Sequence, residues 1–270
     1  LQTRGVEDPR LNAEYLLSSV LTLNRVELYL NFDRPLSEPE KNRYRELLRR
    51  RGRREPLQYL LGETDFRDLT LLVRPGVLIP RPETEQLVER IKTDAPGNGY
   101  QCALDAGCGS GAIGLALLQE HLVKRVIMVD IAPAAIELTR TNAVKNGLDP
   151  DRIGLLTGDM FELNLPRDGS KFDLVVSNPP YIRSDQWDTL APEIRNHEPP
   201  EALLAGEDGL SIHRSLAEYL PSWLNEHGSF YGEIGTGQGE QSRLIHQAWA
   251  RRVEVYPDLA GHDRIIRGLL

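Results

Sequence analysis

The sequence predicts an α/β fold, built on a seven-stranded and mostly parallel sheet and preceded by a small helical domain. Three observations support this. From residue 82 onward, short apolar runs alternate with helical patterns, which is typical of a parallel sheet covered on both faces. A glycine-rich loop stands between one such apolar run and a helical pattern. The region before residue 62 has helical periodicity, and 270 residues are enough for two domains.

Residues 1–61 have the pattern of a helical domain. Asp8 and Pro9 form a helix start signal, and apolar residues follow at helical spacing. Ser37 and Glu40 have the spacing of a capping box and predict a further helix. This region has no glycine-rich loop and no cluster of titratable residues, so we expect it to recognise a substrate and not to catalyse.

Residues 62–81 are predicted to form a β-hairpin that links the two domains. Two short strand patterns, 65–67 and 69–73, precede the Pro75-Gly76 turn signal. The second domain then spans residues 82–270.

Apolar runs and helical patterns alternate through this second domain. The predicted strands are 102–105, 126–130, 153–157, 172–177, 229–234, 252–256 and 264–269. The predicted helices are 84–91, 112–121, 133–146, 210–220 and 239–250.

Composition and charge exclude several classes of protein. A formal net charge of -8 disfavours a protein that wraps nucleic acid, since such binding depends on neutralising phosphates. Residues 41–67 nevertheless hold nine bases and four acids. They are either a solvated helix face or a surface for an RNA-rich or acidic partner.

No apolar run has the length of a membrane span and no signal-peptide pattern is found, so we expect a cytoplasmic protein. Cys102 and Cys108 have no metal-ligand spacing, and neither a metal site nor a disulfide is expected.

The glycine-rich loop runs Asp105-Ala106-Gly107-Cys108-Gly109-Ser110-Gly111 and joins a strand to a helix. Glycines at this place let the chain turn sharply and let a ligand approach the backbone. Residues 109–114 also fit the GxGxxG pattern of dinucleotide-binding domains. However, Asp105 at the strand end would repel a pyrophosphate and would tolerate a cationic sulfonium ligand. The loop therefore favours S-adenosylmethionine.

Two further strand ends carry candidate cofactor residues. Asp130, followed by Ile131, stands where a carboxylate accepts hydrogen bonds from both ribose hydroxyls of an adenosine. A dinucleotide site would use the same residue, and a helix-capping role before Pro133 is the alternative. At the next strand end, Asp159 is placed to receive the adenine amino group, and Met160 or Phe161 to pack on the ring. Core packing explains Phe161 equally well.

The segment Asn178-Pro179-Pro180-Tyr181 follows a buried strand and is the most informative part of the sequence. Two consecutive prolines remove two backbone donors and hold the chain extended. This leaves two fixed acceptors, the Asn178 side-chain oxygen and the Pro179 carbonyl, which would orient an NH2 group. Tyr181 can then cover the flat face of the substrate. An amide nitrogen is a poor nucleophile, so positioning and transition-state electrostatics would have to promote its methylation.

With these motifs in hand, the sequence resembles the HemK-type protein-glutamine methyltransferases, which act on peptide chain release factors. The resemblance covers nearly the whole chain, and the octet Leu78-Ile79-Pro80-Arg81-Pro82-Glu83-Thr84-Glu85 is its most specific part. Its other parts are Glu7-Asp8-Pro9-Arg10-Leu11, Pro56-Leu57-Gln58-Tyr59, residues 105–111 and 178–181, and Gly206-Glu207-Asp208-Gly209-Leu210.

The resemblance implies a Rossmann-like class I methyltransferase domain that uses S-adenosylmethionine and releases S-adenosylhomocysteine. It also implies that the N-terminal helices help to recognise a release factor and that the substrate is the glutamine of its Gly-Gly-Gln loop. We expect catalysis from Asn178, Pro179 and Tyr181, with Pro180 as a further substrate contact. The expected cofactor-binding residues are Asp105, Gly107, Cys108, Gly109, Ser110, Gly111, Asp130, Ile131, Asp159, Met160 and Asn178.

Two departures from the family pattern affect details. Arg67-Asp68 stands where many relatives have an aromatic residue and a glycine, so the hairpin is expected to differ in shape. Met160 replaces an aromatic residue of some relatives, which affects the packing of adenine. The sequence leaves open whether a second set of residues has a functional or a structural role: Arg81, Glu83, Glu85, His197, Glu198 and Glu233.

Other functions remain as alternatives. Asn-Pro-Pro-Tyr also occurs in methyltransferases for adenine in DNA, bases in RNA and ribosomal-protein glutamines, but no segment after Tyr181 supplies a nucleic-acid recognition domain. A nicotinamide-dependent oxidoreductase would need a hydride site that the sequence does not show. A non-catalytic adaptor would not need an intact segment 178–181. We expect a monomer that contacts neither membrane nor specific nucleic acid sequences.

Overall fold

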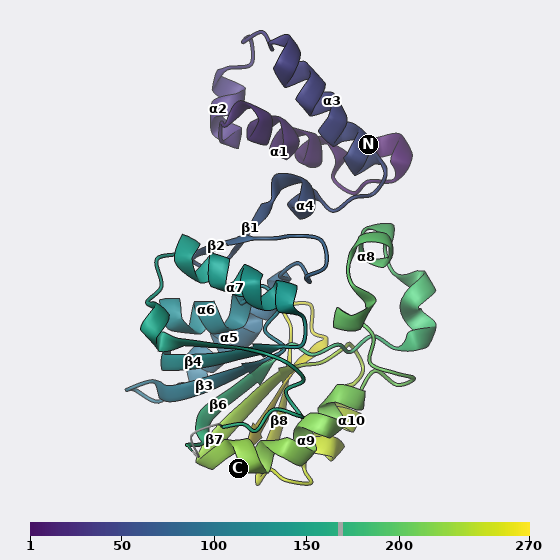
Figure 1. Ribbon diagram of the computed structural model, residues 1–270. Helices are drawn as coiled ribbons and strands as arrows, with labels where there is room; N and C mark the ends of the chain where they lie inside the picture. Colours follow the sequence, from purple (N-terminus) through teal and green to yellow (C-terminus); the bar gives the residue numbers. More distant parts are fainter. Residues whose placement is uncertain (167–169) are drawn as a thin grey trace.

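The computed structural model describes residues 1–166 and 170–270. A helical part, a hairpin and a three-layered α/β part follow one another along the chain (Figure 1). The helical part contains α1 (Pro9–Leu21), α2 (Arg25–Leu30), α3 (Glu38–Gly52) and α4 (Leu57–Leu61). In the described part of the chain, no helix is both long and apolar enough to cross a membrane.

Capping determines where the N-terminal helices begin. The Asp8-Pro9 signal is confirmed, because α1 begins at Pro9. At the start of α3, the Ser37 N–H donates to Glu40 Oε2 at 2.8 Å, as the capping box predicts. Helix α2 was not predicted, although Asn24 and Glu27 form a capping box with the same spacing. Its six residues are too few for a clear apolar period.

The hairpin β1 (Glu63–Phe66) and β2 (Leu69–Leu72) is antiparallel, as predicted. The outer edge of β2 is paired with side chains of the α/β part. Asn142 accepts the Leu72 N–H at 2.7 Å, and Asn146 accepts the Thr70 N–H at 3.1 Å. The hairpin is therefore fixed to α7 (Pro133–Lys145), which contains Asn142 and has Asn146 as its C-cap.

The strands of the α/β part form one seven-stranded sheet in the order β5-β4-β3-β6-β7-β9-β8. Their bounds are β3 Tyr100–Ala106, β4 Val123–Asp130, β5 Ile153–Thr157, β6 Phe172–Ser177, β7 Leu224–Glu233, β8 Arg252–Pro257 and β9 Asp263–Leu269. Strand β9 runs antiparallel to both of its neighbours, so the predicted mostly parallel sheet is confirmed. Strand β7 begins five residues earlier than predicted, because its first half is polar and partly exposed and hides the strand pattern.

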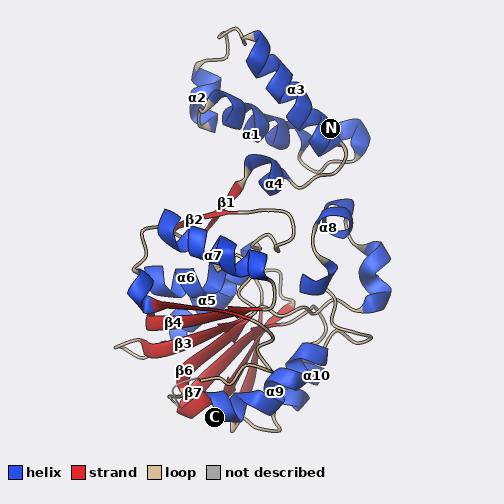
Figure 2. Ribbon diagram, viewed as in Figure 1, coloured by secondary structure: helices blue, strands red, loops and turns tan. Residues whose placement is uncertain are grey.

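Helices cover both faces of this sheet (Figure 2). The remaining helices are α5 (Pro82–Asp94), α6 (Ala112–Gln119), α8 (Pro192–His197), α9 (Ser211–Trp223) and α10 (Gly239–His246). Short 3-10 helices lie at Gln2–Arg4, Pro150–Arg152, Ser184–Thr189 and Pro200–Ala202. One apolar core joins the sheet to α5, α6, α7 and the hairpin, and a second joins the other face to α9. The predicted helix 239–250 ends earlier, at His246.

The helical part contacts the segment between β6 and α9 through one acidic side chain. Glu193 in α8 binds Arg51 in the last turn of α3 at 2.9 Å and Arg54, two residues beyond the end of α3, at 2.6 Å. Arg51 is nearly buried and also donates to Asn12 Oδ1 in α1 at 2.7 Å. Part of the basic stretch 41–67 therefore binds acids of the same chain and does not serve as an open cationic surface.

Candidate active site

A cavity of about 630 Å³ lies where β3, β4, β5 and β6 end, beside the point at which the strand order reverses. Parallel α/β sheets bind ligands at this position, and the volume is in the usual range for small molecules. The cavity is lined in part by predicted site residues: Gly107, Cys108, Gly109, Ser110, Asp130, Ile131, Asp159, Met160, Asn178, Pro179 and Pro180. Residues from four separate strand ends thus meet in one cavity.

The glycine-rich loop is tightly curved, and it is closely packed at Gly111. Gly111 is the N-cap of α6 with a φ of 84°, and an added Cβ there would lie 2.8 Å from Thr139 Cγ2. Gly107 has a φ of 80°, but a Cβ added there would meet nothing within 4 Å. The Gly109 N–H donates to Asp130 Oδ2 at 2.8 Å and so joins the loop to the end of β4. At Gly111 only glycine combines a positive φ with so little space, whereas at Gly107 and Gly109 the positive φ alone favours glycine.

Asp105 lies beneath the loop and is not among the residues that line the cavity. Its Oδ2 accepts the Gly114 N–H at 2.8 Å, whereas its Oδ1 is buried without a hydrogen-bond partner. Burial raises the pKa of Asp105 to about 7. A buried, half-satisfied carboxylate of this kind favours a cation beside the loop.

Asp130 and Ile131 form the cavity wall at the end of β4. The two Asp130 oxygens accept the N–H groups of Gly109 and Ala132 at 2.8 and 2.9 Å. Burial raises the pKa of Asp130 above its usual range, and these two hydrogen bonds oppose the rise. Ile131 is 69% exposed and presents an apolar surface in the cavity.

The end of β5 supplies Asp159, Met160 and Phe161 to the same cavity. The Asp159 side chain accepts the Phe161 N–H at 2.9 Å and shapes the turn. The Phe161 ring stacks on Trp223 with centroids 6.2 Å apart. Core packing is therefore part of the role of Phe161, although the residue also borders the cavity.

Segment 178–181 divides into two parts. Asn178, Pro179 and Pro180 line the cavity, as expected. Tyr181 is not among the lining residues, and its hydroxyl donates to Glu233 Oε1 at 3.0 Å. The expected covering of a substrate by the Tyr181 ring stays a prediction.

Two residues behind this segment belong to the site, and neither was assigned to it from the sequence. Asn178 Nδ2 donates to Thr84 Oγ1 at 3.1 Å, and Thr84 Oγ1 donates to Glu233 Oε2 at 2.7 Å. The sequence alone leaves the role of Glu233 open. Its position at the end of β7, the strand next to β6, is a signal that could have assigned Glu233 to the site.

The structure gives Arg81, Glu85 and Glu198 structural contacts. Glu198 is nearly buried, forms an ion pair with Arg81 and accepts the Ile79 N–H at 3.2 Å. Glu85 accepts the Arg67 N–H at 3.1 Å, at a residue with a φ of 50°. The Arg67 side chain also binds Glu120, so this departure from the family pattern secures the hairpin turn.

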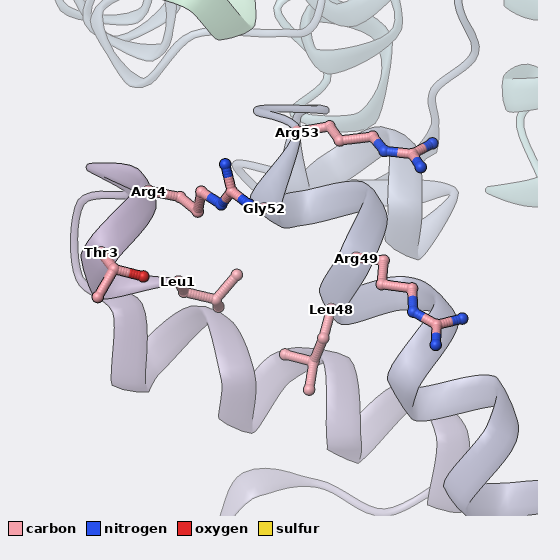
Figure 3. Close-up of a pocket in the computed structure, with 7 residues that line it drawn as sticks. All are labelled: Leu1, Thr3, Arg4, Leu48, Arg49, Gly52 and Arg53. Atoms are coloured by element: carbon pink, nitrogen blue, oxygen red, sulfur yellow. The ribbon is translucent and has the colours of Figure 1, made fainter.

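A second hollow, of about 590 Å³, lies in the helical part against the C-terminal end of α3 (Figure 3). Its lining is Leu1, Thr3, Arg4, Leu48, Arg49, Gly52 and Arg53. It contains no acid, histidine or cysteine that could act as a general base or a metal ligand. This hollow therefore offers none of these groups, whereas the cavity at the sheet is lined by Asp130 and Asp159.

Comparisons with known protein families cover both parts of the chain. The PrmC N-terminal domain matches residues 1–62, and the methyltransferase small domain matches residues 82–197. The release factor glutamine methyltransferase of Geobacter sulfurreducens is 44% identical over 240 residues, which is 89% of this chain and 82% of the relative. That of Clostridium botulinum is 35% identical over 268 residues, 99% of this chain and 94% of the relative.

Solved structures show the same fold at low sequence identity. A methyltransferase from Pyrococcus furiosus has a TM-score of 0.55 and 16% identity, covering 74% of this chain and 88% of its own. The T. thermophilus 16S rRNA N2 G1207 methyltransferase, solved in complex with AdoMet and guanosine, has a TM-score of 0.54 and 15% identity. It covers 74% of this chain and 47% of its own. Both similarities support the predicted Rossmann-like methyltransferase fold.

Proposed function

The chain belongs to the family of release factor glutamine methyltransferases, and we propose that it methylates the side-chain amide nitrogen of a release factor glutamine. The methyl donor is S-adenosylmethionine, and the glutamine is that of the Gly-Gly-Gln loop. One observation supports the proposal most directly. Asn178 and Pro179 both line the cavity, next to the glycine-rich loop, and we assign the Asn178 side-chain oxygen and the Pro179 carbonyl as the two acceptors of the substrate NH2 group.

The residues around the cavity fit S-adenosylmethionine. The Asp105 carboxylate, with one unsatisfied oxygen, lies beneath the loop where a cationic sulfonium and an ammonium group would be stabilised. We propose that Asp130 accepts from the ribose hydroxyls and Asp159 from the adenine amino group. Ile131 and Met160 would enclose the adenine ring. The remaining cofactor contacts are assigned to Gly107, Cys108, Gly109, Ser110, Gly111 and Asn178.

The residues of segment 178–181 act mainly by positioning. When bound, S-adenosylmethionine supplies an electrophilic methyl carbon, whose bond to sulfur breaks with the electron pair going to sulfur. The Asn178 side-chain oxygen and the Pro179 carbonyl each accept one N–H of the substrate amide. The amide nitrogen is thereby oriented towards the glycine-rich loop. The acidity of its N–H groups rises as the bond between the nitrogen and the methyl carbon forms. One proton then leaves the nitrogen for solvent, so no strong base is required.

The two parts of the chain are assigned different tasks. We propose that residues 1–61 recognise the release factor and that residues 82–270 bind the cofactor and catalyse methyl transfer. Residues 62–81 link these two domains. The separate family matches to residues 1–62 and 82–197 support this division. The ion pairs of Glu193 also support this division, because they connect the helical part to the segment that follows Pro179 and Pro180.

Labelled S-adenosylmethionine tests the function. The purified protein is expected to transfer label to a bacterial release factor and not to the same factor with the Gly-Gly-Gln glutamine changed to alanine. DNA and ribosomal proteins serve as parallel acceptors. Equal labelling of the changed factor, or labelling confined to DNA or ribosomal proteins, would refute the proposal.

Cofactor affinity is expected to fall as the pH drops through the range in which the Asp105 carboxylate becomes protonated. A cation binds the ionised carboxylate, and with a pKa of about 7 that form decreases from about nine-tenths at pH 8 to about one-tenth at pH 6. The apparent affinity for S-adenosylmethionine should therefore fall about tenfold over this interval. Calorimetric titration measures it. Asp105→Asn should bind weakly at every pH, and a wild-type profile that matches the variant profile would contradict this role.

A further inference from the structure

A buried chain of polar groups lies behind the substrate-facing side of Asn178. Glu233 is 1% exposed at the end of β7, and Thr84 is 3% exposed in the first turn of α5. Asn178 Nδ2, Thr84 Oγ1 and Glu233 Oε2 are joined in sequence by contacts of 3.1 and 2.7 Å. Tyr181 completes the chain by donating its hydroxyl to the other oxygen of Glu233 at 3.0 Å.

The number of protons on these groups determines which group donates in each of these hydrogen bonds. A threonine hydroxyl has one proton to donate, and an ionised carboxylate only accepts. Once Thr84 donates to Glu233, its oxygen can only accept from Asn178. The Asn178 NH2 group must then point towards Thr84, and the Asn178 side-chain oxygen is left for the cavity. Reversing the Asn178 amide would leave two acceptors facing each other.

Burial raises the pKa of Glu233, and three neighbours oppose the rise. Hydrogen bonds from Thr84 and Tyr181 and the positive charge of Arg264 all favour the ionised form. The carboxylate thus has a hydroxyl donor at each oxygen. These contacts offset part of the cost of removing the charge from water.

A second chain of hydrogen bonds holds the backbone of Glu233. Trp249 Nε1 donates to His246 Nδ1 at 2.9 Å, so the proton of a neutral His246 lies on Nε2. His246 Nε2 then donates to His213 Nδ1 at 3.1 Å, and His213 Nε2 donates to the Glu233 carbonyl at 3.0 Å. Burial lowers the pKa of His213 to about 4, which keeps its ring neutral. The position of Glu233 is therefore fixed independently of the substrate.

We infer that Thr84 and Glu233 are positioning residues that set the polarity of the Asn178 amide, so that the site accepts an amide NH2 and rejects a carboxylate. The inference rests on the proposed function, because it assumes a glutamine in the cavity. A glutamine side chain offers two donors to the Asn178 oxygen and the Pro179 carbonyl. A glutamate side chain would place its negative charge against both acceptors. The enzyme would then distinguish glutamine from glutamate by the orientation of one side chain.

A matched pair of variants tests this inference. Thr84→Val keeps the shape of the side chain and removes the hydroxyl, whereas Thr84→Ser keeps the hydroxyl. With the release factor as substrate, Thr84→Val is expected to lower kcat about 30-fold or more, and Thr84→Ser to stay within about threefold of the wild type. Thr93→Val makes the same exchange at an exposed place in the same helix and should change nothing. Affinity for S-adenosylmethionine should be similar in all four proteins.

Inhibition constants distinguish an effect of Thr84 on the orientation of the Asn178 amide from a general structural role of Thr84. Two changed release factors are used, one with glutamate and one with alanine in place of the Gly-Gly-Gln glutamine. In the wild type, the glutamate factor should inhibit no better than the alanine factor. In Thr84→Val the Asn178 amide is free to turn and donate to a carboxylate, so the glutamate factor should become the better inhibitor by about fivefold.

Three results would overturn the inference. These are a kcat of Thr84→Val near the wild-type value, equal losses in Thr84→Val and Thr84→Ser, or an unchanged ratio of the two inhibition constants. Failure of the wild-type enzyme to methylate the glutamine is a separate result, seen before any variant is compared. It would refute the proposed function, and this inference with it.

Discussion

Asn178→Ala is expected to lower kcat for methyl transfer to the release factor by about 100-fold or more. The change removes one of the two acceptors that orient the substrate amide, and the effect should fall on the transition state. Affinity for S-adenosylmethionine should change by less than about threefold, because Asn178 is one of many assigned cofactor contacts and the glycine-rich loop and Asp130 remain intact. Steady-state kinetics and calorimetric titration measure the two effects separately.

A comparison with Asn178→Asp makes this test sharper. Aspartate preserves the shape of the side chain but has no NH2 group to donate to Thr84, and it places a charge near the buried Glu233. It should be at least as inactive as the alanine variant. Wild-type kcat in either variant would refute the proposed amide clamp.

Gly107→Ala is expected to weaken S-adenosylmethionine binding by about tenfold or more. Gly107 lines the cavity, and a Cβ added there meets no protein atom within 4 Å, so the new methyl group would occupy ligand space. The variant should still fold, because the cost of a φ of 80° in alanine is about 1–2 kcal/mol. Thermal unfolding and calorimetric titration measure both quantities.

Gly147→Ala is the matched control. Gly147 also has a positive φ, of 65°, and an added Cβ there meets nothing within 4 Å, but the residue is exposed and does not line the cavity. Both variants should lose similar stability, and only Gly107→Ala should lose affinity. Equal affinities in the two variants would show that the space beside Gly107 is not used by the cofactor.

The sequence predicted those parts of the site that are formed by neighbouring residues. The glycine-rich loop and segment 178–181 have their conformations determined by glycine and proline, so their chemistry can be inferred without knowing the rest of the fold. Both of these motifs follow strands whose ends meet at one edge of the sheet. The prediction that they share a site therefore followed from the fold class.

The contacts that the sequence did not predict join residues far apart in the chain. Thr84 and Asn178 are separated by 94 positions, and Thr84 and Glu233 by 149. Within its own helix, Thr84 has the pattern of an ordinary residue of the first turn. Its role depends on how α5 lies over β6 and β7, and local patterns do not determine that packing.

Other unpredicted contacts have the same origin. The pairing of Asn142 with the edge of β2 depends on the docking of the hairpin onto α7. The ion pairs of Glu193 depend on the approach of α8 to α3. Helix α2 is different, because its Asn24 and Glu27 capping box is local and could have been recognised.

The most direct test of the account is to locate the transferred methyl group. A release factor incubated with the enzyme and S-adenosylmethionine is digested, and fragment masses are read across the peptide that contains the Gly-Gly-Gln loop. The account predicts the mass of one added methylene on the glutamine, and acid hydrolysis that releases methylamine from its side chain. A methyl group on another residue, on the backbone, or on an oxygen atom would contradict it.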